Sequence, residues 1–91
     1  SDYIRDYSFV GLVKQEDDGS GYTVVEQRNK FCVGDEIEIF GPGTPYYTEV
    51  IKDMTDEEGN PIESAPHPQQ VLRIKFDRQP KEHFILRKKK S

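Results

Sequence analysis

The sequence predicts an all-β protein, a small closed β-barrel of six to seven strands. Three observations predict this fold class. Short runs of alternating apolar and polar residues recur between turn signals rich in Gly, Pro and Asp, and no run carries the capped apolar stripe of a helix. Gly11 inside the first run and the polar break after Gln27 predict the bend and the corner of a barrel. Closure also removes the exposed edges of a small sheet.

The first part of the chain predicts a hairpin followed by a corner. Residues 8–15 are rich in β-forming side chains, and the acidic segment 16–21 contains glycines suited to a turn. Residues 22–27 return as the second strand. The polar residues 28–30 then interrupt the apolar pattern before it resumes at 31–33, which predicts a bulge or a sharp corner.

The middle of the chain predicts two further strands after a Gly-Asp turn. Residues 36–40 alternate clearly, with Ile37 and Ile39 on one face. We expect residues 41–45, which are rich in Gly and Pro, to end that strand because Pro lacks the hydrogen-bond donor of the ladder. Residues 46–55 then predict a single strand with apolar and polar residues on both faces.

The last third predicts a proline-braced loop and two strands. Prolines on both sides of His67 restrict the chain to extended geometry. Residues 71–76 alternate throughout, and a last strand is expected at 83–87. The side chains of 71–76 expected to face the core are Leu72, Ile74 and Phe76. We therefore divide the chain into a lead-in at 1–7, a barrel domain at 8–87 and a basic tail at 88–91.

Charge is distributed unevenly along this chain of 91 residues with net charge −4. Residues 1–60 carry 5 Lys or Arg against 14 Asp or Glu, and residues 61–91 carry 8 against 3, so the two parts differ at −9 and +5. This pattern argues against a generally basic nucleic-acid-binding protein, because such affinity needs a surface that displaces counterions from phosphates. It leaves room for a local basic patch in the second part.

The cysteine count and the absence of targeting segments predict a cytoplasmic protein without a membrane partner. Cys32 is alone and cannot form an internal disulfide, and no signal peptide or long apolar span is evident. The chain begins at Ser1 rather than Met, which we interpret as a piece of a longer protein.

Several motifs, in order, resemble the C-terminal domain of the peptidase U32 family, the collagenase-like peptidases. They are FVGLV, VEQRNKF, VGDEIEIFGP, DEEGNPI, APHPQQ and LRIK, and the resemblance as a whole spans residues 7–87. The resemblance implies a β-barrel similar to the second domain of elongation factor Tu, appended to an upstream catalytic domain. Some members of the wider family are tRNA or rRNA hydroxylation enzymes, whose chemistry and cysteine-ligated cluster belong to that upstream domain.

Eight residues are candidate contacts for a partner or substrate: Arg28, Asn29, Lys30, His67, Gln69, Gln70, Arg73 and Lys75. An Arg fork can bind phosphate or carboxylate through two parallel bonds, and Gln amides donate and accept at once. Each segment also has a structural alternative. The Arg of the corner can pair with Glu26 or Asp35, the Asn can adopt the left-handed conformation of a bulge, and the His and Gln side chains can close the hydrogen bonds of their own loop.

Catalytic and metal sites are the weaker alternatives. Cys32, His67 and Asp35 have the residue types of a nucleophile, a base and an orienting acid, but their spacing tests none of the required hydrogen bonds. His67 and His83 are isolated histidines without the spacing of a metal site. We predict no catalytic residue, metal or cofactor here.

These features and the resemblance are compatible with three functions. The first is a non-catalytic accessory barrel of a collagenase-like peptidase that positions a macromolecular substrate or docks on the catalytic domain. The second is an RNA-binding module of a U32-type tRNA or rRNA hydroxylation enzyme, which uses the basic second part and the corner at 28–30. The third is a structural adaptor with an interface at Tyr46 or Tyr47.

Overall fold

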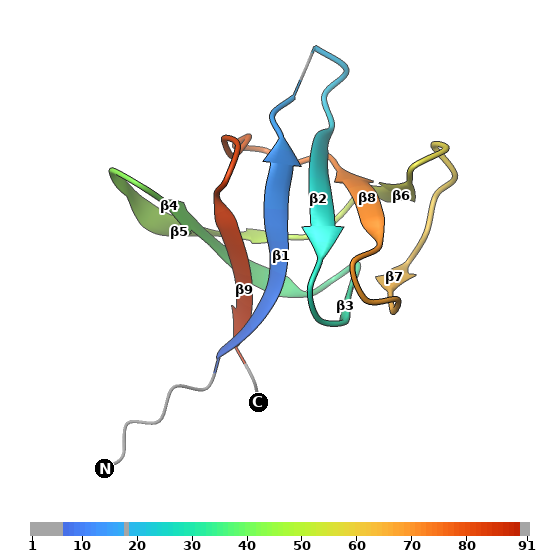
Figure 1. Ribbon diagram of the computed structural model, residues 1–91, viewed down its shortest axis with the longest axis horizontal. Coiled ribbons are helices and arrows are strands. Elements are labelled where there is room, and N and C mark those ends of the chain that lie inside the picture. Colours follow the sequence, from blue (N-terminus) through green and yellow to red (C-terminus); the bar gives the residue numbers. More distant parts are fainter. Residues whose placement is uncertain (1–6, 18, 90–91) are drawn as a thin grey trace.

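The computed structural model describes residues 7–17 and 19–89 and contains only strands and connecting segments there (Figure 1). The strands are β1 (Tyr7–Gln15), β2 (Thr23–Gln27), β3 (Phe31–Cys32), β4 (Glu36–Gly41), β5 (Thr44–Val50), β6 (Met54–Asp56), β7 (Ser64–Ala65), β8 (Val71–Ile74) and β9 (Ile85–Lys89). Within these residues, no helix is long and apolar enough to cross a membrane.

Seven strands form the main sheet in the order β5-β4-β9-β1-β2-β8-β6, and β3 pairs with β7 in a second, two-stranded sheet. All of the pairs are antiparallel. Strand β1 shifts register against β9 between Phe9 and Gly11. A Cβ on Gly11 would lie 2.8 Å from Val25 Cγ1, so this position needs a residue without a side chain. The bend and close approach expected at Gly11 are confirmed.

The two edge strands of the sheet, β5 and β6, follow one another in the chain, and side chains bridge the seam beside β5. The Glu49 carboxylate accepts hydrogen bonds from the backbone N–H groups of Asp77 and Arg78 at 2.9 and 2.6 Å. The Tyr47 hydroxyl donates to the Arg78 carbonyl at 3.1 Å. The all-β class and a main sheet of seven strands are confirmed. Closure of that sheet into a barrel stays a prediction, because no backbone ladder joins β5 to β6.

The core lies on the inner face of the curled sheet, as the alternation predicts. Ile37 and Ile39 of β4 are fully buried. The three inward residues expected from the 71–76 pattern are also buried, although β8 itself ends at Ile74. The complete buried apolar set is Val10, Val13, Val25, Phe31, Ile37, Ile39, Ile51, Met54, Ala65, Leu72, Ile74, Phe76, Phe84 and Leu86.

The strand expected at 46–55 is wrong in its extent. Strand β5 begins earlier, at Thr44, and ends at Val50. Beyond it, Ile51 still faces the β4 side, but it bonds to both Gly34 and Asp35, at 2.8 and 3.0 Å, so that two residues oppose one and the regular ladder ends. Residues 42–43 form a hairpin turn between β4 and β5, in which Gly43 has a φ of 72°. The segment at 41–45 is therefore a tight reversal, and Pro45 is tolerated because β5 is an edge strand.

The last strand is displaced from its expected position at 83–87. It runs from Ile85 to Lys89, so Lys88 and Lys89 of the predicted basic tail lie within β9. Lys90 and Ser91 lie outside the described residues. At the other end, Tyr7 of the predicted lead-in is the first residue of β1.

Candidate functional site

The two polar segments predicted as contacts, at 28–30 and 67–70, are brought together at one end of β2 and β8. The Gln27 N–H donates to the Gln70 carbonyl at 2.7 Å, and the Gln69 N–H donates to the Gln27 carbonyl at 2.9 Å. The Gln27 side-chain amide also donates to the Ala65 carbonyl. Segments that are about forty positions apart in sequence therefore form one continuous surface.

The corner after β2 is fastened to β1. The N–H of Arg28 donates to the Val10 carbonyl at 2.8 Å, and the Asn29 side-chain amide donates to the Phe9 carbonyl at 2.7 Å. Asn29 does not adopt the left-handed conformation considered for it; the non-glycine residues with positive φ in the described part are Gln69 and His83. Asn29 is better explained as a side-chain brace, because its amide donates to a carbonyl of β1 and so holds the corner against that strand.

Arg28 forms the internal ion pair that was one of its two alternatives. Its Nη1 lies 3.3 Å from Glu26 Oε1, and its guanidinium carbon lies 5.3 Å from the centroid of the Phe9 ring. The Phe9 side chain is itself exposed. A single long contact to one carboxylate leaves the other N–H groups of the fork able to bind a ligand, because the guanidinium carries five donors.

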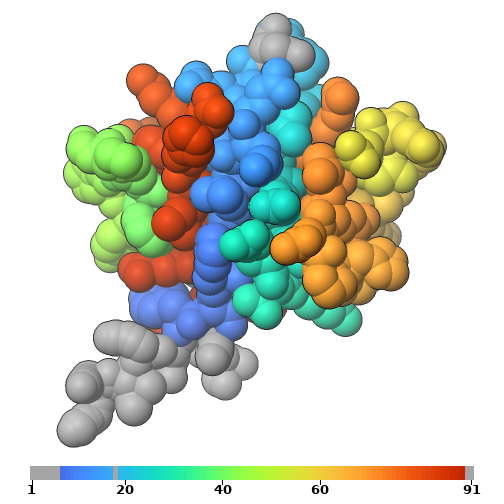
Figure 2. Space-filling view, in the orientation of Figure 1, coloured from blue at the N-terminus to red at the C-terminus, as the bar shows by residue number. Residues whose placement is uncertain are grey.

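The strand register places the remaining basic candidates on the outer face of β8. Arg73 pairs with Val24 of β2 and is exposed, whereas its neighbours Leu72 and Ile74 are buried. Lys75 is exposed beyond the end of the strand. Figure 2 shows that β9, β1, β2 and β8 lie side by side across this side of the molecule. We call the exposed residues Phe9, Arg28, Lys30, Arg73 and Lys75 the basic face.

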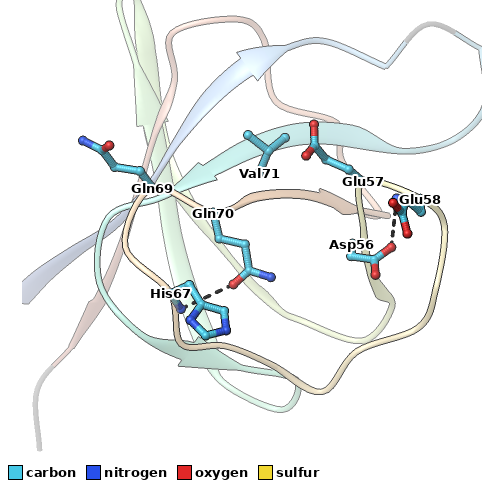
Figure 3. A pocket seen from close by; sticks show the side chains of 7 residues that line it. All are labelled: Asp56, Glu57, Glu58, His67, Gln69, Gln70 and Val71. Carbon is cyan, nitrogen blue, oxygen red and sulfur yellow. Dashed lines mark hydrogen bonds between the residues drawn. The ribbon is translucent and has the colours of Figure 1, made fainter.

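A hollow of about 440 Å³ lies beside this surface, between the turn after β6 and the loop before β8 (Figure 3). Its lining is Asp56, Glu57, Glu58, His67, Gln69, Gln70 and Val71. The Gln70 Oε1 accepts the His67 N–H at 3.4 Å, and the Gln70 N–H donates to the His67 carbonyl at 3.1 Å. The Gln70 side chain therefore satisfies a backbone group of its own loop, as the structural alternative for these residues predicts.

One wall of the hollow is acidic. The Asp56 carboxylate accepts the N–H groups of Glu58 and Asn60, both at 2.9 Å, and these bonds, that of Asn60 first, hold the pKa of Asp56 below its usual range. Asp56 is thus an ionised brace of its turn, and Glu57 and Glu58 are exposed beside it. This wall repels phosphate, so the hollow and the basic face favour ligands of opposite charge.

A second arginine, Arg87, which ends the last strand expected from the sequence, occupies the centre of the outer face of β1, β9 and β4. The Nε and Nη2 of Arg87 lie 2.8 and 2.7 Å from Glu38 Oε1. Its guanidinium carbon lies 4.1, 4.9 and 6.0 Å from the ring centroids of Tyr7, Phe40 and Tyr46. The Tyr7 hydroxyl donates to the other oxygen of Glu38 at 3.1 Å. We call these five residues the arginine clamp.

The alternation of Ile85–Lys89 was the available signal for this clamp. With Leu86 buried, Arg87 must point outward. Its partners come from the opposite end of the chain and from β4, so the cluster itself was not visible in sequence.

The Cys-His-Asp alternative finds no support in the hydrogen bonds of the residues described. The Asp35 carboxylate instead accepts the Cys32 N–H at 2.8 Å and the Lys88 ammonium at 3.0 Å. No hydrogen bond in this part joins His67 to Cys32 or to Asp35. Across residues 7–17 and 19–89, no cluster of three or more His, Cys, Asp or Glu residues is arranged to hold a metal ion.

Comparison with known families settles where this fold belongs. Residues 5–87 match the family described as Peptidase family U32 C-terminal domain. The chain belongs to the U32 family. Its resemblance in FVGLV, VGDEIEIFGP and the other motifs is therefore confirmed, and the described β-structure is that of a U32 C-terminal domain.

Among curated proteins, the U32 domain is 39% identical over 84 residues to tRNA hydroxylation protein P1 of Bacillus subtilis (strain 168). The match covers 92% of this chain and 20% of that protein, so the chain spans about a fifth of the length of its curated relative. Whatever the whole relative does, four-fifths of it has no counterpart in the chain.

Two solved structures of the C-terminal domain of a Geobacillus thermoleovorans U32 peptidase are also similar. The selenomethionine variant is 41% identical with a TM-score of 0.83, covering 89% of this chain and 99% of that one. The other is 40% identical with a TM-score of 0.79, covering 91% and 92%. These crystallised chains consist almost entirely of the domain, which indicates that a U32 C-terminal domain folds without the rest of its protein.

Proposed function

We propose that this U32 C-terminal domain is a non-catalytic accessory module that positions a macromolecular substrate for the rest of its polypeptide, and that the substrate is RNA. The observation that carries the proposal is the basic face. Three exposed cations, Arg28, Arg73 and Lys75, lie on the outer side of the β2–β8 pair, and the guanidinium of Arg28 lies over the exposed ring of Phe9.

Cations beside an exposed aromatic ring match the chemistry of RNA. Lys and Arg bind phosphates by displacing counterions, and an aromatic ring stacks on an unpaired base. The ring of Phe9 lies under the Arg28 guanidinium, so a base and a phosphate can be held at neighbouring points. The acidic wall at Asp56 and Glu58 then limits the path of the backbone to one side of the β8 strand.

The curated relative supports RNA over peptide, because it is described as a tRNA hydroxylation protein. In this proposal, the upstream part of the polypeptide supplies the chemistry, and RNA modification places the protein in the cytoplasm. The eight candidates have graded roles. Arg28, Arg73 and Lys75 contact RNA phosphates, and Lys30 adds positive charge at the corner. Asn29, His67, Gln69 and Gln70 shape the end of the face through their backbone contacts.

A peptide substrate of a collagenase-like peptidase is the second candidate. The solved relatives, described as domains of a U32 peptidase, favour it. The acidic hollow at His67 and Gln70 suits a basic or neutral peptide better than it suits a nucleic acid.

Titration of the 91-residue chain with labelled tRNA tests the proposal. Three phosphate contacts predict that affinity falls roughly 20- to 40-fold between 50 and 200 mM salt, and that Arg73→Ala reduces the salt slope by about one contact. Fluorescence anisotropy measures both. Lys52→Ala is the matched control, because it removes the same charge from a lysine paired with Asp77 away from the basic face.

Two results contradict the proposal. One is the absence of binding at 50 mM salt. The other is equal weakening by Lys52→Ala and Arg73→Ala, which would show an attraction without a defined face.

A further inference from the structure

The two edges of the main sheet differ in how their backbone is covered. Along β6, the Asp56 N–H donates to the Asn60 carbonyl at 2.9 Å, and the Ile62 N–H donates to the Met54 carbonyl at 3.0 Å. Thr55 also bridges to Pro61. The chain thus folds back over its own β6 edge and satisfies the groups there.

Strand β5 has no backbone partner on its outer edge within the described part of the chain; only the side chains of Tyr47 and Glu49 bridge from it to the segment at Asp77 and Arg78. Ile51 directs both its N–H and its carbonyl toward the β4 side, to Asp35 and Gly34. Because these directions alternate along an antiparallel strand, the peptide groups of Val50 and Thr48 point to the open side. Neither residue takes part in a backbone hydrogen bond outside the strand ladders of the described residues.

Space and apolar surface accompany this open edge. A hollow of about 510 Å³ lies along it, between β5 and the segment at Asp77 and Arg78. The side chains of Tyr46 and Val50 are 60% and 47% exposed, which makes them the most exposed large hydrophobics of the described chain. An open strand edge with apolar side chains and room beside it is the arrangement that accepts an added strand.

The arginine clamp connects the first strand of the domain to β5 across the two strands, β9 and β4, that lie between them. Arg87 packs against Tyr7, the first residue of β1, and also against Tyr46 of β5. The clamp therefore joins the point where the chain enters the domain to the strand with the open edge.

We propose that the rest of the U32 polypeptide docks on the β5 edge by adding an extended segment as a further strand, with Tyr46 and Val50 as its apolar contacts. The curated relative has four-fifths of its length outside the matched region, and the matched domain is C-terminal by family. That preceding part joins the described chain at Tyr7 of β1, on the same outer face as Tyr46 and with two strands between it and β5. Covalent linkage gives it a high effective concentration, so a short strand pairing suffices.

This docking is independent of the substrate, because β5 and the basic face are different surfaces. It also separates two adjacent tyrosines that were indistinguishable in sequence. Tyr46 is exposed at the proposed interface, whereas the Tyr47 hydroxyl donates to the Arg78 carbonyl of the same domain.

Hydrogen exchange measured by mass spectrometry tests the docking by comparing the 91-residue chain with the full-length protein that carries it. The isolated chain is a valid reference, because the related domains crystallise alone. We expect the β5 peptide that includes Thr48 and Val50 to exchange at least tenfold more slowly in the full-length protein. Peptides of β6, whose edge is already covered, serve as the internal control and should not change.

Two variants of the full-length protein sharpen the result. Thr48→Pro removes a donor that points to the open side, so the isolated chain should keep its fold while the full-length protein loses the protection of β5. Val50→Lys leaves the backbone unchanged and should have the same effect, because a charge opposes burial at an edge.

Equal exchange of β5 in the isolated chain and the full-length protein overturns the proposal. Protection that rises with the concentration of the isolated chain also overturns it, because the occupant is then a second copy. The RNA titration described above is unaffected by either result, so the two proposals fail separately.

Discussion

Arg28 and Arg87 occupy similar positions on the outer face of the sheet, but they are held very differently. Their side chains are 36% and 32% exposed, so exposure does not distinguish them. Arg87 contacts Glu38 through two nitrogens at 2.7–2.8 Å and is surrounded by three aromatic rings. Arg28 makes one contact to Glu26 at 3.3 Å and lies over one ring.

The difference indicates which arginine can serve a ligand. A guanidinium held to a carboxylate through a hydrogen bond and a second close nitrogen contact, and packed among rings, is not free for a ligand, and withdrawing it leaves Glu38 and the rings without their partner. Arg28 can rotate toward a phosphate at little cost, because an exposed pair at 3.3 Å contributes only about 0–1 kcal/mol. Arg87 therefore stabilises the domain, and Arg28 belongs to its binding surface.

The largest loss of stability is expected from a substitution in the core beneath the basic face. Leu72 is fully buried between the two outward neighbours Val71 and Arg73. Leu72→Ala should reduce the free energy of unfolding by about 2–5 kcal/mol, since it removes apolar contacts and leaves a cavity. Urea denaturation followed by circular dichroism measures the change. A loss below about 1 kcal/mol would show that β8 presents its other face to the core.

Arg87→Ala tests the comparison itself. It should destabilise the domain by about 1–3 kcal/mol, because a charge-assisted hydrogen bond, a close ion-pair contact and the ring packing are lost. Arg28→Ala is the matched control and should change stability by less than about 0.5 kcal/mol. Thermal and urea unfolding of both variants measure which substitution destabilises the domain more. If Arg28→Ala were the more destabilising change, the assignment of the two arginines would be reversed.

The sequence predicts the features of the fold that depend on neighbouring residues. Alternation at 71–76 correctly identifies Leu72 and Ile74 as core residues, because side-chain direction in a strand depends only on neighbouring positions. The break of 46–55 into β5 and β6 was not visible, because it depends on the hydrogen bond from Ile51 to Asp35, sixteen positions away.

The candidate sites follow the same division. Arg28 was recognisable as a polar residue at a corner, and its neighbour Glu26 as a possible partner. The clamp on Arg87 was not recognisable, because Tyr7, Glu38 and Arg87 meet only when β1, β4 and β9 lie side by side. For residues whose role depends on nonlocal strand pairing, the local alternation shows that the side chain points outward but not which partners it meets.

The smallest effect expected concerns the phenol of the clamp. The hydrogen bond that Tyr7 donates to Glu38 raises the pKa of its hydroxyl above the usual value near 10, and partial burial adds to the rise while Arg87 opposes it. A raised pKa means that folding favours the neutral phenol. This contribution to stability is complete below the unfolded pKa and is lost as pH rises through the folded one.

The ionisation of Tyr7 therefore reports whether the clamp is closed. Subtracting the 295 nm titration of Tyr7→Phe from that of the unaltered chain isolates this phenol. Glu38→Gln should lower the pKa of Tyr7, because it removes the carboxylate that favours the protonated form and leaves the Arg87 charge beside the ring. In an Arg28→Ala background the titration of Tyr7 should stay in place, since Arg28 lies over Phe9 and not over Tyr7. A shift there as large as in Glu38→Gln would mean that the two arginines belong to one coupled cluster, and their division into a stabilising and a binding residue would no longer hold.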